Sequence, residues 1–308
     1  MDTLRQDIRY AIRALLKSPG FVAVAVLCMA LGIGVNSTVF SVINSVFLRP
    51  FPFTDPDRLV ALYEANLRRG DEIDGPSFQN IRDWQRLTTS FSDVAAASYR
   101  SLTFVDGEEP ERIRGATVTW NFFPTLGVQP VIGRGFREED DRPGAAGVVL
   151  LSHDLWTRRY ANDSSVIGRT VIVNAAAHTI VGVMPPRFRF PENEEAWVPL
   201  TPIEHAASRS ERGLIATARL APGITMSQAR IELAAVARRL EEQYPTDNTG
   251  WTSRIVGIRD DLMPADVRLI TLTMMGAVTF VLLIACANVA NLMLARMTAR
   301  TREVAIRT

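Results

Sequence analysis

Residues 21–48 read FVAVAVLCMALGIGVNSTVFSVINSVFL, and residues 269–295 read LITLTMMGAVTFVLLIACANVANLMLA; neither stretch contains Asp, Glu, Lys, Arg or His. About 20 apolar residues cross a hydrocarbon core of roughly 30 Å, whereas a run of about 10 to 14 is more typical of a buried core helix. Both stretches exceed this requirement. We therefore predict two transmembrane helices, which separate a large middle region from two short ends.

Residues 1–20 form an amphipathic segment ahead of the first stretch. Its apolar residues recur at helical spacing, with Arg5, Arg9 and Arg13 on another side, which is typical of a helix lying in a membrane interface. The alternative for residues 21–48 is a cleaved secretory signal, but the apolar core of a signal is only about 7 to 15 residues long. We predict an interfacial helix over 1–20, followed by a retained span. The apolar residues are Leu4, Ile8, Ala11, Ile12, Leu15 and Leu16.

The charge of the chain is sorted by region. The formal net charge is +1, but residues 1–20 carry +2, residues 296–308 carry +3, and 26 Arg against 30 acidic residues leave 49–268 at −4. Short loops rich in Lys and Arg stay in the cytoplasm, so we expect both termini there and residues 49–268 outside. The near-neutral total argues against a nucleic-acid partner.

The outer region, 49–268, mixes strand-like and helix-like patterns, which predicts an α+β domain between the two spans. Helices are expected over 78–87 and 227–243, the second capped by Thr225 or Ser227. The region contains no cysteine, so a core rather than disulfides must hold it together. Strands are expected at 102–105, 112–119, 148–151, 170–173 and 178–183.

The sequence offers no catalytic, cofactor or metal site. Its only lysine, Lys17, lacks the glycine-rich turn of an ATP-binding P-loop. The three histidines, His153, His178 and His205, have no metal-ligand spacing, and Ser152-His153-Asp154 lies too close together in sequence for a catalytic triad. The acidic run 138–141 lacks the spaced oxygens of a calcium loop and is interpreted as a solvated turn. We predict that the chain is not an enzyme.

A stripe of small residues follows one side of the first span: Ala30, Gly34, Ser37, Ser41 and Ser45. Small side chains let membrane helices approach closely, so the stripe is a candidate helix-packing surface. Gly, Ala and Ser are also common in membrane helices in general. A dedicated packing surface and the ordinary composition of a membrane helix are therefore equally open interpretations of the stripe.

Several motifs resemble the macrolide-exporter and FtsX-type ABC permeases, especially their duplicated orphan branch. The resemblance covers almost the whole chain, and the order and spacing of the motifs carry it. They are Asp7 to Tyr10, Lys17 to Phe21, Ala30 to Gly34, Arg49-Pro50, Phe122 to Gly127, Gly133 to Phe136, Leu151 to Trp156, Gly182 to Pro186 and Thr301 to Arg307. One departure is Ala175 after Asn174, where the family often has Asn-Gly and where alanine takes a positive φ poorly.

The resemblance implies a permease of the bacterial inner membrane with a MacB-like periplasmic core domain at 49–268. It also implies a separate ABC ATPase, contacted by the start of a coupling segment at 296–308. The candidate contacts are Arg302, Glu303 and Arg307, although basic residues here also suit topology and anionic lipid headgroups. Family members continue through further spans and pair with a second permease unit, so the chain is expected to be part of a homo- or pseudo-dimer and of a longer protein.

Two functions from different classes follow. The first is a permease that couples ATP hydrolysis by its partner to export or periplasmic handling of a substrate. The second is a two-span sensor whose outer domain binds a ligand, because such receptors have the same layout.

Overall fold

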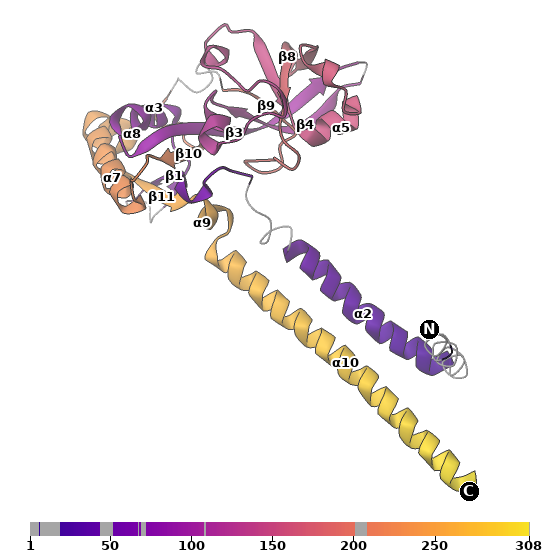
Figure 1. The fold of residues 1–308 in the computed structure, drawn as a ribbon. Coiled ribbons are helices and arrows are strands. Elements are labelled where there is room, and N and C mark those ends of the chain that lie inside the picture. The colour runs from indigo at the N-terminus through magenta and orange to yellow at the C-terminus, as the bar shows by residue number, and fades with distance from the viewer. Residues whose placement is uncertain are drawn as a thin grey trace. The chain divides into compact units, whose positions relative to one another are not determined.

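A computed structural model describes residues 6, 19–43, 52–66, 68, 72–107, 109–200 and 208–307. The chain divides into two compact units (Figure 1). One combines residues 1–50 with 263–308, and the other is Phe51–Leu262. Of the interfacial helix expected over 1–20, the structure describes only Gln6, Pro19 and Gly20.

In the first unit the structure describes two long helices. Helix α2 is Pro19–Ile43, and α10 is Ala265–Arg307, a single helix of 43 residues. They run antiparallel: Gly32 of α2 faces Ala285 of α10, and the Asn36 side-chain amide reaches the Val278 carbonyl oxygen at 3.4 Å. Among the described residues, the segment Ala265–Asn291 is long and apolar enough to cross a membrane.

The second unit is built on one mixed sheet with the strand order β11-β1-β10-β3-β4-β9-β6-β8-β5. Most neighbouring strands are antiparallel, whereas β4 with β9 and β6 with β8 are parallel. The α+β class predicted for this region is thereby confirmed. The strands are β1 Leu59–Asn66, β2 Glu72–Asp74, β3 Phe91–Val105, β4 Glu111–Val118, β5 Ile132–Gly133, β6 Gly147–Leu151, β7 Thr170–Val173, β8 Ala176–Val183, β9 Ala196–Pro199, β10 Ile215–Leu220 and β11 Trp251–Gly257.

Helices α3 (Phe78–Leu87) and α7 (Met226–Gln243) pack on the open half of the sheet, near β1, β10 and β11 (Figure 1). Ser77 caps α3 by accepting the backbone N–H of Asn80, and Thr225 caps α7 in a capping box with Gln228. Both helices were expected from the sequence, and Thr225 rather than Ser227 is the cap. Their apolar faces share a core that includes Trp84 and Leu233.

The other half of the sheet closes on itself. Strand β3 pairs with β4, β4 with β9, β9 with β6, β6 with β8, β8 with β7, and β7 returns to β3 at Phe104–Val173. We call these six strands the ring. Every strand of the ring contributes side chains to one buried cluster, which includes Leu102, Ile113, Val149, Val171, Ile180 and Ala196. The ring is therefore a small closed barrel with a packed interior.

Helix α5 (His153–Tyr160) covers one end of the ring. It follows directly from the end of β6, and its Leu155 joins the cluster inside the ring. At the same end, the Tyr160 hydroxyl donates to Asp106 at 2.6 Å, just after β3. Because α5 follows the last residue of β6, the first residue of β6, Gly147, lies at the opposite end of the ring.

An aromatic core lies outside the ring, and three of the four family motifs in the outer region contribute residues to it. Phe122 and Phe123 belong to the short helix α4 (Phe122–Leu126), which ends at Gly127 with φ of 69°. Phe123 contacts Phe136 and Trp197, with ring centroids 5.9 and 5.7 Å apart. The motifs that carry the family resemblance in the outer region are therefore mainly structural.

The hairpin between β7 and β8 is tight although alanine replaces the expected glycine. Asn174 and Ala175 form a two-residue turn with φ of 49° and 66°. Asn174 also anchors the turn on β3, because its side-chain oxygen accepts the Thr103 N–H at 2.9 Å and its own N–H donates to the Thr103 carbonyl at 2.9 Å. These bonds fix Asn174 on the neighbouring strand, and Ala175 completes the turn in a left-handed conformation.

Candidate functional site

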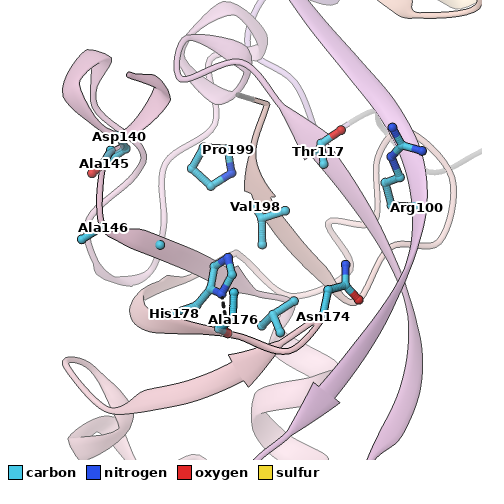
Figure 2. Close-up of a pocket in the computed structure, with 12 residues that line it drawn as sticks. Arg100, Thr117, Asp140, Ala145, Ala146, Asn174, Ala176, His178, Val198 and Pro199 are labelled. Carbon is cyan, nitrogen blue, oxygen red and sulfur yellow. Dashed lines mark hydrogen bonds between the residues drawn. The ribbon is translucent and has the colours of Figure 1, made fainter. Parts of the chain in front are cut away.

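A pocket of about 510 Å³ opens at the end of the ring opposite α5 (Figure 2). All six strands of the ring and the Asn174 turn line it, together with residues 145 and 146 and Asp140 of the preceding loop. Mouths of β-barrels are common places for small-molecule sites. We call this pocket the ring mouth.

Along each of three strands, the inward-facing side chains are apolar inside the ring and polar at this mouth. Side chains alternate along a strand, so Arg100 lies on the same face of β3 as the buried Leu102 and Phe104. By the same alternation, Thr117 continues the row of Ile113 on β4, and His178 continues the row of Ile180 on β8. Polar residues thus form the top layer of an otherwise apolar interior.

Local contacts position these polar groups. The Nδ1 of His178 lies 3.0 Å from the Ala176 carbonyl oxygen, which can only accept, so Nδ1 carries the proton. A side chain at Gly147 would come within 2.9 Å of the His178 ring, so glycine leaves room for the imidazole. Thr117 is 7% exposed, and its hydroxyl oxygen has no hydrogen-bond partner among the described residues.

The acidic run 138–141 forms a 3-10 turn against the domain. Asp140 pairs with Arg134 at 2.6 Å, and Asp141 accepts the Trp120 N–H at 2.7 Å. Burial raises the pKa of the Asp141 carboxyl to about 7, and the Trp120 N–H partly offsets this rise. Asp141 and Trp120 also line a second pocket of about 300 Å³. The run is thus a docked turn rather than a freely solvated one.

A buried ionic cluster joins β1, α3 and the segment that leads into β10. Arg212 pairs with Glu64 at 2.8 Å and donates to the Asn248 side-chain oxygen at 2.9 Å. Asn80 of α3 donates to Glu64, and Arg209 pairs with Asp83 of α3 at 2.7 Å. Every member has a charged or amide partner, so the cluster is a structural connection within the domain.

The predicted site residues in the membrane unit lie apart from these pockets. Ala30, Gly34, Ser37 and Ser41 are exposed on α2, and Ser45 lies outside the described residues. Helix α2 contacts α10 through Gly32, which does not belong to the small-residue stripe. Packing of the stripe against another helix therefore stays a prediction. Helix α10 includes Arg302, Glu303 and Arg307, and the structure describes their backbone but not their side chains.

Sequence reasoning missed the ring mouth. His178 was considered only as a metal ligand, and Arg100 precedes the strand that was expected to begin at Leu102. The sequence did contain a signal for this pocket, because in β3, β4 and β8 a polar residue follows the alternating apolar residues that face inward. Among the described residues, no group of three or more His, Cys, Asp or Glu side chains could hold a metal ion.

The family model of the MacB-like periplasmic core domain matches residues 22–236. The chain is also 25% identical over 255 residues, 76% of its length, to the probable syringafactin export ATP-binding/permease protein SyfD of Pseudomonas syringae pv. syringae (strain B728a). It spans 37% of that relative's length.

One solved structure shares the fold at low sequence identity. The periplasmic region of MacB from Actinobacillus actinomycetemcomitans matches with a TM-score of 0.51 and 14% identity, over 72% of this chain and 99% of that chain. The extracellular domain of the noncanonic ABC-type transporter YknZ from Gram-positive bacteria matches with a TM-score of 0.46 and 14% identity, over 64% of this chain and 99% of that chain. From the family match, the chain belongs to the MacB-like periplasmic core domain family and carries the extracytoplasmic domain of an ABC-transporter permease.

Proposed function

We propose that the chain is the N-terminal part of a membrane permease that couples ATP hydrolysis by a separate ATPase to export or periplasmic handling of a substrate. In this proposal, movement at the cytoplasmic end of α10 is transmitted along the helix to the outer domain. Family membership favours this role over that of a two-span sensor.

The continuity of α10 is the observation that carries the proposal. The helix begins at Ala265, three residues after α9 (Ile258–Leu262) ends the folded domain, and continues to Arg307. At 1.5 Å per residue, its 43 residues extend about 65 Å, roughly twice the thickness of a hydrocarbon core of about 30 Å. One helix therefore includes the apolar segment Ala265–Asn291 and the predicted coupling residues. An unbroken helix transmits displacement better than a jointed one.

The proposed topology places both termini in the cytoplasm and the second unit outside, in a bacterial inner membrane. It is supported by the basic ends and by the acidic middle region. In this arrangement α2 and α10 both cross the bilayer. Anionic lipid headgroups would contact the basic residues after Ala295, and Ala30, Gly34, Ser37 and Ser41 would meet a second permease unit.

A separate ABC ATPase is the proposed cytoplasmic partner. The only lysine of the chain is Lys17, outside any P-loop motif, so ATP binding must be supplied by another domain or subunit. The name of SyfD includes both an ATP-binding and a permease function, which supports the pairing of the two activities. A partner encoded beside this chain is the first candidate.

Reconstitution tests the proposal. The full-length permease and the ATPase encoded beside it are placed in nanodiscs, and the ATP hydrolysis rate is compared with that of the ATPase alone. We expect the permease to change this rate, and Met297→Pro to abolish the change because proline breaks a helix. Met297→Ala is the matched control. A rate unaffected by wild-type permease would contradict the pairing, and full coupling by the proline variant would contradict transmission along α10.

A further inference from the structure

We propose that the second pocket, between α3 and the 3-10 turn Glu138–Asp141, binds one neutral pyranose sugar. Hydroxyls of the sugar bond to Asp141 and Asn121, and its apolar face stacks on the indole of Trp120. Among the described residues, this pocket shares none of its lining with the ring mouth, and the proposal does not depend on coupling to an ATPase. Its volume of about 300 Å³ is at the small end for ligand pockets and suits one pyranose rather than a chain.

Two buried oxygen atoms are the first argument. The Nδ2 of Asn121 donates to the Asp93 carboxylate at 2.6 Å and to the Val94 carbonyl at 2.9 Å, which fixes the orientation of the amide. Asn121 is 3% exposed, and its Oδ1 has no hydrogen-bond partner among the described residues. The Oδ1 of Asp141 is buried and lacks a partner in the same way. Buried polar atoms are nearly always bonded, so two such oxygens on residues of one pocket indicate a ligand that supplies donors.

The groups that would contact the sugar are held side by side, which is the second argument. The Asp141 carboxylate accepts the backbone N–H of Trp120 at 2.7 Å, and Asn121 is the next residue along the chain. Trp120 is 36% exposed and lines the pocket. A pyranose has an apolar C–H face that can cover an indole, while the hydroxyls at its edge reach polar neighbours. One hydrogen bond and one peptide bond therefore hold an aromatic surface and two acceptors together.

The charge of the pocket favours a hydroxyl over an ion. Two arginines and two acids line it, Arg82, Arg142, Glu138 and Asp141, and their formal charges cancel. Burial raises the pKa of the Asp141 carboxyl to about 7, so near neutral pH this group exists with and without its proton. A hydroxyl can donate to the carboxylate and accept from the carboxylic acid, whereas an ammonium group can only donate. Asp141 therefore suits a sugar hydroxyl in both protonation states.

The base of the pocket requires a ligand that is partly apolar. Phe78 and Ile81 of α3 line it, and both side chains are buried. An inorganic ion would leave these side chains uncovered, whereas a hydrocarbon would leave the oxygens of Asn121 and Asp141 without donors. Because these oxygens are buried, the ligand reaches them only when exposed side chains of the pocket wall turn aside, and rotamers of exposed residues interchange within nanoseconds.

The test uses the excised domain, residues 51–262. This unit has its own hydrophobic cores, and the similar periplasmic region of MacB has been solved as a separate piece. The methyl α-pyranosides of glucose, galactose and mannose are titrated into the 15N-labelled domain and followed by NMR. Cyclohexylmethanol, which has a single hydroxyl, and cyclohexylmethylamine, which is a cation at neutral pH, are titrated in parallel.

We expect at least one pyranoside to bind saturably and at least about tenfold more tightly than either cyclohexane compound. The reason is that only the pyranoside brings several hydroxyls to acceptors that are otherwise unpaired. The shifted signals should include the indole N–H of Trp120 and the backbone N–H groups of Trp120 and Asn121.

Variants locate the interaction. Trp120→Ala removes the aromatic surface but keeps the backbone N–H that Asp141 accepts, and it should weaken binding at least about tenfold. Asp141→Asn keeps an acceptor for that N–H but replaces the other oxygen by a group that only donates, so it should also weaken binding. Tyr99→Ala is the matched control, because Tyr99 is 48% exposed and does not line the pocket.

The spectrum of each variant reports that the domain is folded. No saturable shift with any pyranoside, or equal or tighter binding of either cyclohexane compound, would overturn the proposal. So would shifts that map elsewhere, or unchanged binding by Trp120→Ala or by Asp141→Asn.

Discussion

The Nε atom of Arg212 lies 2.8 Å from the Oε2 atom of Glu64, and the two side chains are only 5% and 6% exposed. Arg212 also covers the ring of Trp251 at 3.9 Å. Removing one partner of such a pair leaves an uncompensated buried charge, which typically costs about 3 to 5 kcal/mol. The ion pair therefore makes the connection between β1 and the segment before β10 sensitive to substitution.

The first prediction concerns this pair. Glu64→Gln should lower the free energy of unfolding of the 51–262 domain by about 3 kcal/mol, measured by urea denaturation. Glu138→Gln is the control, because Glu138 and Arg142 are 66% and 69% exposed and an exposed pair contributes at most about 1 kcal/mol. Similar losses in the two variants would contradict a special role for the buried pair.

The second prediction concerns the dependence of stability on pH. Burial raises the pKa of Asp141 from 3.8 to about 7. The unfolded chain releases this proton near pH 4, whereas the folded domain holds it until about pH 7, so its stabilising effect is lost as the pH rises through this window. The loss reaches at most about 4 kcal/mol.

Asp141→Asn isolates the contribution of this group. The amide oxygen still accepts the Trp120 N–H, but the side chain no longer titrates. We expect wild type to lose more stability than the variant between about pH 4 and pH 8, measured by urea denaturation. Parallel pH profiles would show that Asp141 titrates normally in the folded domain.

The third prediction concerns the β7–β8 turn. Ala175 has φ of 66°, where alanine is strained and glycine is not. Ala175→Gly should therefore raise the free energy of unfolding by about 0.5 to 1 kcal/mol. Ala177→Gly in β8 is the control and should lower it by a similar amount, because glycine weakens a strand. Destabilisation by both changes would mean that chain entropy outweighs the strain at Ala175.

The fourth prediction concerns topology. A reporter active only outside the cytoplasm should be active when fused after Gly147 and inactive when fused after Arg307. The reason is that residues 49–268 carry −4, while both ends are basic. A cytoplasmic reporter should give the opposite pattern in the same two fusions. Activity after Arg307 alone would reverse the orientation and remove the proposed function.

The fifth prediction concerns coupling. The α10 backbone places Glu303 and Arg307 one turn apart on the same side of the helix, and Glu303 is the only acid after residue 268. Topology and headgroup binding need no acid, so Glu303→Lys should preserve insertion but reduce the permease-dependent ATP hydrolysis of the partner. Thr308→Lys is the control, because it adds a charge and keeps Glu303. Normal coupling in Glu303→Lys would leave the basic residues as topology signals.

Local sequence patterns predicted some elements better than others. Helices α3 and α7 were expected because their apolar residues recur at helical spacing and their caps are explicit. Strand β3 was expected only from Leu102, although it begins at Phe91. Its first half contains Ala95, Ala96 and Ala97, all fully buried, and alanine is uncommon in strands. Crowding between the sheet and its covering layers, rather than strand propensity, explains these alanines.

The sequence by itself determined the two uncharged stretches, the sorting of charge between ends and middle, the α+β class and the family. These features depend on composition and on residues close together in the chain. The ring was decided only by the tertiary structure, because its closure requires Phe104 of β3 to pair with Val173 of β7. That register brings Arg100, Thr117 and His178 to one mouth. A pairing between distant strands is set by how whole faces pack, and no local pattern encodes it.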